Sequence, residues 1–178
     1  MINVSVIIPN YNHADFLKER IESVLAQTYT LFELIILDDA STDNSREIIE
    51  SYRQHPVVSN IVYSDFNSGS PFRQWQKGIL LAKNDWIWIA ESDDIALPIF
   101  LETAIKYLSE NNKAGLYYCN SSIEITGHTG KTTANFCQKI LNLDIWQNNY
   151  SVNGMIEINR TLKYSSTIPN LSLIHIYN

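Results

Sequence analysis

The stretch Trp-Ile-Trp-Ile-Ala-Glu-Ser-Asp-Asp, residues 86–94, joins an apolar run directly to a cluster of carboxylates. The run has no polar break, which is typical of a strand buried on both faces of a parallel sheet. Glu91, Asp93 and Asp94 come directly after the run, and ligands of open α/β sheets bind beyond the carboxyl ends of the strands. Glu91 and Asp93 can lean towards one point, where their oxygens suit Mg²⁺ or Mn²⁺. Taken alone, an acidic turn that caps the next helix is the simpler interpretation.

A second acidic pair changes this balance. Leu34–Leu37 forms another apolar run, and Asp38 and Asp39 follow it immediately. Right-handed crossovers bring the carboxyl ends of parallel strands to one edge of the sheet, so the two acidic groups can lie in one crevice. Clustered carboxylates repel one another and raise one another's pKa, and a bound divalent cation removes this cost. Together the two groups favour a metal site.

The rest of the amino-terminal part alternates short apolar runs with helical patterns. Pro9 is expected to end the first strand, Asn12 to cap the first helix and Ser41 to cap the second. The alternation predicts an α/β fold with right-handed crossovers and a mostly parallel sheet flanked by helices. Besides the run at 86–90, strands are expected at Val4–Pro9, Leu34–Leu37, Val57–Tyr63 and Leu116–Cys119. The apolar residues expected on helices are Leu17, Ile21, Val24, Leu25, Ile48, Ile49, Tyr52, Phe72, Trp75, Ile79, Leu80, Phe100, Leu101, Ala104, Ile105 and Leu108.

Past Asn120 the pattern weakens. Ile123 and Ile125 alternate with polar residues, and the glycines of the segment 127–130 predict a hairpin turn. Mixed helix and loop, with Trp146 as an anchor, is expected up to Asn153. The last segment, 171–178, has no cap, turn or charge. It resembles translated sequencing adapter, so we expect an artefactual tail on a chain that is cut short.

Composition bounds the function. The chain has 178 residues, 45% of them hydrophobic, which fits one folded domain with a small appendage. Its net charge is −6 and the sequence contains no Lys/Arg cluster, which argues against a nucleic-acid partner. Cys119 and Cys137 have no metal-like spacing and predict no disulfide framework, which favours a reducing cytosol. No dinucleotide-type glycine loop or Walker lysine is present, so nicotinamide and flavin cofactors are not expected.

The sequence also predicts a soluble, cytoplasmic chain. No basic segment followed by a cleavable apolar run opens it. No stretch approaches the roughly 18 consecutive apolar residues that a membrane-spanning helix needs.

Four motifs in order resemble the signature of family 2 glycosyltransferases, which have the Rossmann-like GT-A fold. They are Val-Ser-Val-Ile-Ile-Pro-Asn-Tyr-Asn at 4–12, Ile-Ile-Leu-Asp-Asp-Ala-Ser-Thr-Asp at 35–43, Asn-Ser-Gly at 67–69 and Ala-Glu-Ser-Asp-Asp at 90–94. Each motif is weak alone, but their order and spacing are specific. The resemblance extends from Met1 to about Cys119.

The resemblance implies roles for individual residues. Pro9 and Tyr11 would line a nucleotide pocket, although Tyr11 alone reads equally well as a packing aromatic. Asp39 would accept a hydrogen bond from the base, commonly uracil. Asp93 stands at the metal-binding position. Glu91 stands where the family usually has Asp, and its longer side chain would reach either the ribose or the metal.

Other assignments stay open. Many relatives carry an Arg-Asn pair before a glycine, and here Trp75-Gln76-Lys77-Gly78 stands near that place. Arg73 or Lys77 would then contact the diphosphate, whereas a helix-surface cation is the alternative for each. Asp94 is either a neighbouring ligand or a helix-capping carboxylate.

The resemblance implies a metal-dependent, inverting transfer. A sugar would pass from a nucleotide-diphosphate donor, UDP-linked by expectation, to a hydroxyl of a glycan or lipid-linked acceptor. Relatives build surface polysaccharides, often at the cytoplasmic face of the membrane, which implies peripheral membrane association. A carboxylate general base is expected late in such chains, but Asp144 and Glu157 lie in no recognisable base motif, so none is assigned. The expected division is a nucleotide-sugar-binding core at 1–122, the start of an acceptor-side region at 123–170 and the tail at 171–178.

Two other functions stay open. The chain could be a fragment that binds nucleotide without transferring sugar, because the acceptor half is missing. It could also be a receiver-like signalling domain whose Asp38–Asp39 pair binds Mg²⁺ and accepts a phosphoryl group. The acidic cluster at 91–94 speaks against the receiver interpretation, since such domains place no acidic triad there.

Overall fold

The structure is a computed structural model that describes residues 1–119, 121–125, 128–132, 149, 151–156 and 172–175. The chain divides into two compact units. The first unit comprises Met1–Tyr117 with Asn170–Asn178, and the second comprises Tyr118–Pro169.

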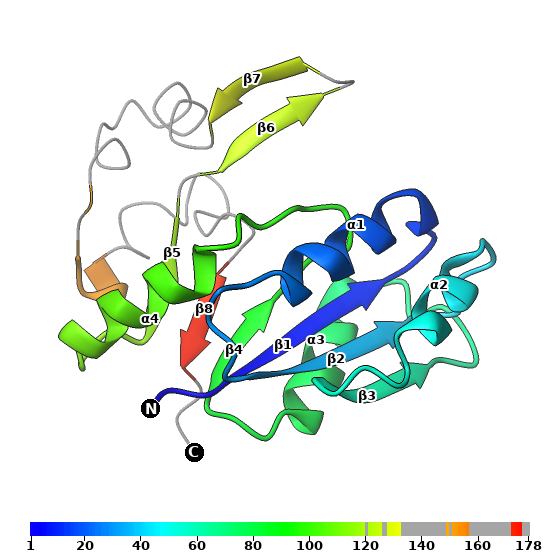
Figure 1. The fold of residues 1–178 in the computed structure, drawn as a ribbon, viewed down its shortest axis with the longest axis horizontal. Helices are drawn as coiled ribbons and strands as arrows, with labels where there is room; N and C mark the ends of the chain where they lie inside the picture. Colours follow the sequence, from blue (N-terminus) through cyan, green and yellow to red (C-terminus); the bar gives the residue numbers. More distant parts are fainter. Residues whose placement is uncertain (120, 126–127, 133–148, 150, 157–171, 176–178) are drawn as a thin grey trace. The chain divides into compact units, whose positions relative to one another are not determined.

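A parallel sheet forms the centre of the first unit (Figure 1). Its four parallel strands lie in the order β3-β2-β1-β4, and β8 and β5 continue the sheet beyond β4. β8 is antiparallel to β4. The predicted α/β class and parallel sheet are confirmed. The bounds are Val4–Asn10 for β1, Phe32–Asp38 for β2, Val58–Tyr63 for β3, Trp86–Ile89 for β4, Leu116–Tyr118 for β5 and Ser172–His175 for β8.

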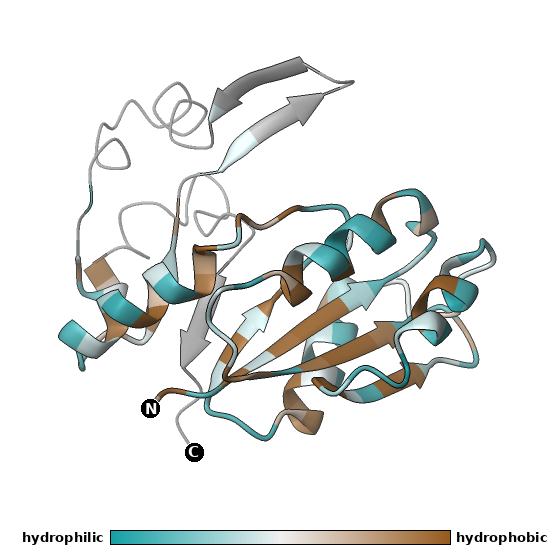
Figure 2. Cartoon of the chain, in the orientation of Figure 1, coloured by the Kyte–Doolittle hydropathy of each residue, from teal (hydrophilic) through white to brown (hydrophobic). Residues whose placement is uncertain are grey.

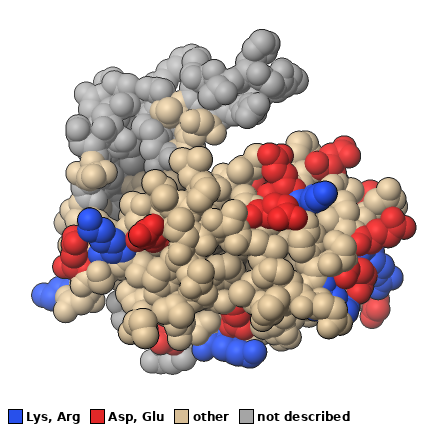
Figure 3. Space-filling view, viewed as in Figure 1, with Lys and Arg blue, Asp and Glu red and all other residues tan. Residues whose placement is uncertain are grey.

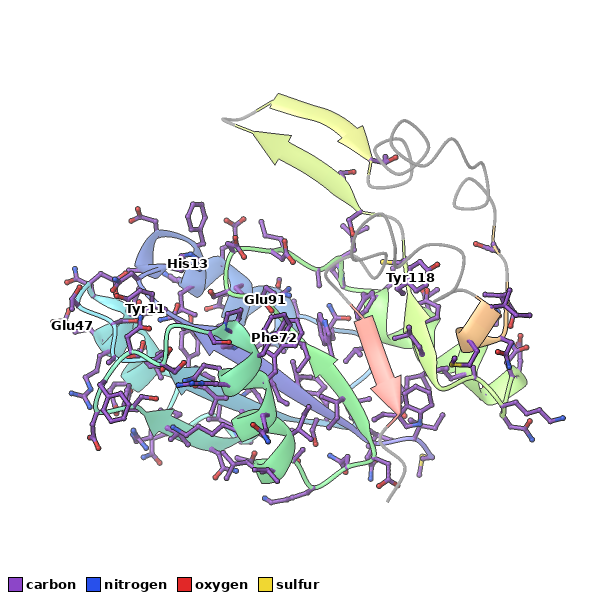
Figure 4. All side chains as sticks on the ribbon, turned by 180° about the vertical axis from the view of Figure 1, so that it is seen from behind. Tyr11, His13, Glu47, Phe72, Glu91 and Tyr118 are labelled. Carbon is purple, nitrogen blue, oxygen red and sulfur yellow. The ribbon has the colours of Figure 1, made fainter. Side chains whose placement is uncertain are left out.

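Helices cover both faces of this sheet. Figure 1 shows α3 behind the sheet, with α1 and α4 in front, and Figure 4, from the opposite side, agrees. The bounds are Ala14–Leu25 for α1, Ser45–Ser51 for α2, Pro71–Leu81 for α3 and Phe100–Glu110 for α4. The helices therefore provide the right-handed crossovers that place the strand ends at one edge.

Strand β4 is the doubly buried strand that the sequence of residues 86–94 predicts. Ile87 and Ile89 belong to a core cluster against which Trp75 and Ile79 of α3 pack. Trp88 points to the other face, where its ring centroid lies 4.7 Å from that of Phe100 in α4. Figure 2 shows the apolar character of the central strands β1 and β2. An unbroken apolar run is needed because each face of the sheet is covered by a helix.

Pro9 does not end the first strand, contrary to expectation. β1 continues to Asn10, which pairs in register with Asp38 of β2. Pairing of β1 with β4 ends earlier, at Ile7, whose carbonyl accepts from Ala90 N. Because the backbone of Asn10 bonds towards β2, the nitrogen of Pro9 faces the side on which β4 has already ended. A proline is tolerated there as on an edge strand.

Both expected helix caps are wrong. The N-cap of α1 is His13 rather than Asn12, and Asp43 Oδ2 accepts from the first helical amide, Ala14 N, at 2.9 Å. The N-cap of α2 is Asn44 rather than Ser41. Asn12 and Ser41 instead bond to each other's loop: Asn12 N donates to Ser41 Oγ at 2.9 Å. Tertiary contacts between two strand-end loops thus replace the local caps.

The described residues of the second unit include a two-stranded antiparallel hairpin, β6 (Ser122–Ile125) and β7 (His128–Thr132). Ile125 pairs with His128, so the strand begins inside the segment expected to form the turn. Trp146 and most of the region around it lie outside the described residues. The division by role at 1–122, 123–170 and 171–178 stays a prediction, as does the artefactual origin of the tail, four of whose residues form β8.

Candidate functional site

Both acidic groups leave the sheet at the same edge. β1 lies between β2 and β4, and both neighbours run parallel to it. Asp39 N donates to the carbonyl of Asn10 at 2.9 Å, and Ala90 N donates to that of Ile7 at 2.8 Å. Asp39 and the acidic turn, defined as residues 91–94, therefore follow strands that end on either side of β1. The predicted common edge is confirmed.

Asp38 is a structural carboxylate. It is 4% exposed. Its Oδ1 accepts from Asn10 Nδ2 at 2.9 Å, and its Oδ2 accepts from Ser41 N at 3.0 Å. These bonds hold the end of β1 to the loop that follows β2. Both oxygens of Asp38 are thus engaged in bonds within the chain, whereas Asp39, which is equally 4% exposed, has a different set of partners.

Asp39 is fixed by Ser68, which lies in the motif at 67–69, and by Gln74, which the sequence did not single out. Its Oδ2 accepts from Ser68 N at 2.9 Å and Ser68 Oγ at 2.7 Å, and its Oδ1 accepts from Gln74 Nε2 of α3. An ionised carboxylate offers about four acceptor positions. One position on Oδ1 therefore remains for a ligand N–H.

The acidic turn combines exposed and buried groups. Asp93 is exposed, Glu91 is partly buried, and Ser92 is 2% exposed. Ser92 Oγ and His13 Nδ1 lie 2.7 Å apart, which links the turn to the loop after β1. Figure 4 shows Tyr11, His13 and Glu91 near the ends of β1 and β4. The turn is therefore braced from the start of α1.

Glu91 holds its proton unusually strongly. The pKa of its carboxyl group is raised to about 7: burial is the main cause, the charges of Asp93 and Asp94 act in the same direction, and Trp75 and Arg20 partly oppose them. Burial and neighbouring carboxylates both disfavour the charged form. Such a perturbed carboxylate beside the end of a parallel strand is typical of a functional site.

The donor set fits a hard cation only in part. Glu91 Oε1 is buried without a hydrogen-bond partner, so it is an oxygen available to a cation. Within the described residues, however, no group of three or more His, Cys, Asp or Glu side chains is arranged to hold a metal ion. Mg²⁺ typically takes one or two carboxylates and completes its coordination with substrate phosphates and water. Glu91 and Asp93 therefore suit a cation that arrives together with a phosphate-bearing ligand.

The other residues predicted for the site come from β1, the loop after it and α3. Tyr11 is 44% exposed, whereas Pro9 is buried within β1. Lys77 Nζ lies 3.3 Å from Ser64 Oγ, directly after β3, and Arg73 Nη1 donates to the carbonyl of Ser68 at 3.4 Å. Both cations of α3 thus lie near the residues that contact Asp39.

Sequence reasoning missed the supporting polar residues. Gln74 and Arg20 are buried, at 5% and 0% exposure. Arg20 stands three positions after Leu17 and one before Ile21, on the apolar face of its helix. This placement was the available signal, because a charged residue on such a face needs a partner. Ser68 and Ser92 lie inside the motifs at 67–69 and 90–94 but were given no role of their own, and His13 gave no comparable signal.

Comparisons with known proteins agree with this arrangement. The sequence profile of "Glycosyl transferase family 2" matches residues 5–166. Glycosyltransferase GlyG of Streptococcus pneumoniae is 35% identical over 118 residues, which are 65% of this chain and 39% of that protein. The putative teichuronic acid biosynthesis glycosyltransferase TuaG of Bacillus subtilis is 33% identical over 111 residues, 62% of this chain and 44% of that protein. The chain thus spans less than half the length of these curated relatives.

Solved structures share the fold. Staphylococcus aureus TarS, residues 1–349, matches 98% of this chain and 47% of its own with a TM-score of 0.70 and 20% identity. The mannosyltransferase PcManGT of Pyrobaculum calidifontis, solved with GDP-Man and Mn²⁺, matches 66% of this chain and 35% of its own with a TM-score of 0.59 and 24% identity. At these identities the likeness concerns the fold.

Proposed function

The chain belongs to glycosyl transferase family 2, and from that premise we propose that the carboxyl edge of its sheet binds a nucleotide-diphosphate sugar whose sugar is transferred to a hydroxyl acceptor. One observation carries the proposal: Asp39 and the acidic turn follow the two strands that flank β1, at the same edge of the sheet. Ligands of open parallel sheets bind at this place.

Asp39 is the proposed base-recognition residue. Ser68 and Gln74 hold its carboxylate from two sides and leave one acceptor position on Oδ1. An imide N–H, as in uracil, is the matching donor. A UDP-linked donor is further supported by the TarS complex with UDP-GlcNAc, a protein of the same fold. Tyr11 is exposed and follows Asn10, whose carbonyl accepts from Asp39 N, and it would stack on the base.

Asp93 and Glu91 are the proposed holders of a divalent cation, Mn²⁺ or Mg²⁺. A cation bound there supplies positive charge against the leaving diphosphate. Lys77 and Arg73, on α3, would contribute further positive charge to the phosphates. The proposed transfer is inverting: the acceptor oxygen attacks the anomeric carbon while the nucleoside diphosphate departs. No residue is assigned as the general base.

The proposed acceptor is a glycan or lipid-linked hydroxyl in surface polysaccharide synthesis, with the protein at the cytoplasmic face of the membrane. TuaG, a relative, is named for teichuronic acid biosynthesis. Among the described residues, each helix is too short or too polar to cross a bilayer. A peripheral position is therefore proposed for this part of the chain.

The test is calorimetry of UDP binding with Mn²⁺ and with a chelator. We expect binding that depends on Mn²⁺ and weakens at least about tenfold in Asp93→Ala, corresponding to the loss of one charged ligand. Asp85→Ala is the matched control, because Asp85 is an exposed carboxylate before the opposite end of the same strand, β4. Equal affinities of wild type and Asp93→Ala would contradict the metal assignment.

A second candidate is nucleotide binding without transfer. This candidate is favoured because the chain spans only 39% of the length of GlyG and 44% of that of TuaG. Release of free sugar from UDP-sugar, compared with transfer to an added acceptor, separates the two functions. Binding without either reaction would identify the chain as a donor-binding part.

A further inference from the structure

Arg20 is an internal charge beneath the acidic turn. It lies on α1, is 0% exposed, and its guanidinium carbon stands 5.3 Å from the centroid of the Trp88 ring. Its Nε, Nη1 and Nη2 are all buried without a hydrogen-bond partner among the described residues. Arginine is rarely buried without paired acceptors, because transfer of its charge from water is costly.

The carboxylates that offset this cost belong to the acidic turn. The pKa of Arg20 is lowered to about 10, because burial lowers it more than the charges of Asp94, Glu91 and Asp93 raise it. Arg20 therefore stays protonated at neutral pH. The contact with Trp88 adds a cation–π attraction and places the guanidinium on the face of β4 that α1 and α4 cover. The buried charge and the three carboxylates form one electrostatic unit.

We propose that Arg20 is a positioning residue: it is the internal counter-charge that holds the acidic turn together before a cation or diphosphate binds. Without it, three carboxylates would repel one another at the end of β4. With it, the turn is arranged in advance, so the incoming ligand does not have to gather the carboxylates. This inference rests on the proposed function, in which the turn holds a cation.

A merely space-filling Arg20 would behave differently from a counter-charge. Methionine has a similar unbranched stem and fills irregular gaps. If Arg20 only fills space, Arg20→Met should leave stability unchanged or improved, because a costly buried charge is removed. If Arg20 is a counter-charge, the same variant leaves the carboxylates uncompensated and loses stability.

The experiment is thermal unfolding in a chelator at pH 8, across a series of NaCl concentrations. For Arg20→Met we expect a Tm lower by about 10 °C at low salt. We also expect a steeper rise of Tm with salt than in wild type, because ions screen the exposed part of the turn. Arg20→Lys should keep the salt dependence of wild type. A Tm and salt slope of Arg20→Met equal to those of wild type would overturn the proposal.

Arg46→Met is the control for the loss of one positive charge, at an exposed position. Arg46 also lies over an aromatic ring, 4.2 Å from the centroid of Tyr63, but belongs to α2 and interacts with Glu50 rather than with the acidic turn. Its loss should leave the salt slope unchanged. A steeper slope in this variant as well would overturn the assignment of the effect to the turn.

A double variant covers the case in which Arg20→Met does not fold. Asp94 contributes the largest charge interaction with Arg20. Arg20→Met combined with Asp94→Asn should therefore recover at least half of the lost Tm, or restore folding. No recovery would overturn the proposal. Adding Mn²⁺ and UDP to wild type separates the two hypotheses: if neither binds while the salt slope and the double variant behave as expected, Arg20 keeps its role and the proposed function fails.

Discussion

At the scale of single residues, the candidate site depends on two strained positions. Asn12 and Ala40 adopt positive φ, 55° and 62°, although neither is glycine. Asparagine tolerates this region, whereas for alanine it costs about 1–2 kcal/mol. Ala40 follows Asp39 directly, and its turn allows Ser41 to reach Asp38, Asn10 and the amide of Asn12. The strain at Ala40 is thus part of how the acidic pair is held.

Ala40→Gly should stabilise the chain. Glycine adopts positive φ without strain, and its greater freedom in the unfolded chain cancels part of the gain, which leaves about 0.5–1 kcal/mol. The corresponding rise in Tm is about 1–4 °C by calorimetry. Ala104→Gly, at a buried position in α4, is the control and should lower the Tm. A lower Tm in Ala40→Gly would show that the left-handed turn is not the preferred state.

Asp39→Asn should reduce both stability and nucleotide binding. Three donors point at the Asp39 carboxylate, from Ser68 N, Ser68 Oγ and Gln74 Nε2. An asparagine amide would turn its own NH2 group towards one or more of these three donors. We therefore expect a loss of about 1.5–3 kcal/mol in the free energy of unfolding, measured by denaturant titration. UDP affinity, measured at a temperature where the variant is folded, should fall as well. Unchanged UDP affinity would remove Asp39 from base recognition, with exposed Asp65→Asn as control.

At the scale of elements, the contact of α3 with β1 positions Gln74 and Lys77. Gly78 of α3 lies directly on Ile7 of β1: a Cβ added there would meet Ile7 Cγ2 at 2.5 Å and Cδ1 at 2.9 Å. Ile7 is fully buried and has little room to move. Close packing of this helix therefore depends on a position without a side chain.

Gly78→Ala should destabilise the chain. Overpacking in a closed core costs about 1–3 kcal/mol, although alanine favours the helix by about 1 kcal/mol, so the net loss is smaller than the clash alone. Chemical denaturation measures it. Gly154→Ala is the matched control, since a Cβ there would meet nothing within 4 Å. Equal stability of both variants would mean that α3 can move away from the sheet at no cost.

Sequence patterns predicted the elements better than the loops between them. The apolar runs located β1, β2 and β4 because burial on both faces leaves a direct mark on composition, and β3, which is half-buried along its length, was located as well. The caps were wrong because Asn12 Oδ1 accepts from Thr42 N, and Ala14 N donates to Asp43, across about thirty residues. Pairings of that separation leave no local pattern. Asp39 and the acidic turn were predictable as strand-end carboxylates, whereas their partners Gln74, His13 and Arg20 depend on how helices lie against the sheet.

At the scale of the whole molecule, the charge distribution bears on how the proposed site would attract a diphosphate. The net charge is −6, and on the face in Figure 3 the Lys and Arg side chains stand apart from one another beside acidic ones. No broad positive field on that face would attract a diphosphate. In the proposed function, positive charge for the phosphates would come from a bound divalent cation and from the few basic side chains near the site, such as Lys77.

At the opposite edge of the sheet, Glu33 makes the stability of the fold depend on pH. Its Oε1 accepts from Ser5 Oγ at 2.7 Å and from Lys83 N at 2.7 Å, and its Oε2 lies 3.7 Å from Lys83 Nζ. The carboxylate of β2 thus joins β1 and the loop before β4. Burial alone would raise the pKa of Glu33, but hydrogen bonds from Ser59, Ser5 and Lys83, with the charge of Lys83, lower it below the ordinary 4.5.

This lowered pKa predicts how Glu33→Gln changes the response to acid. Because the folded pKa lies below the unfolded one, the ionised group stabilises the fold above pH 4.5, and this contribution is lost as the pH falls through the folded pKa. Glu33→Gln should therefore have a lower Tm than wild type at pH 7, and the difference should shrink steadily below pH 4.5. Taking the difference between the two proteins cancels the titration of other groups, Glu91 included. A difference that stays constant from pH 7 to about pH 3 would show that the hydrogen bonds of Glu33, and not its charge, hold the three segments together.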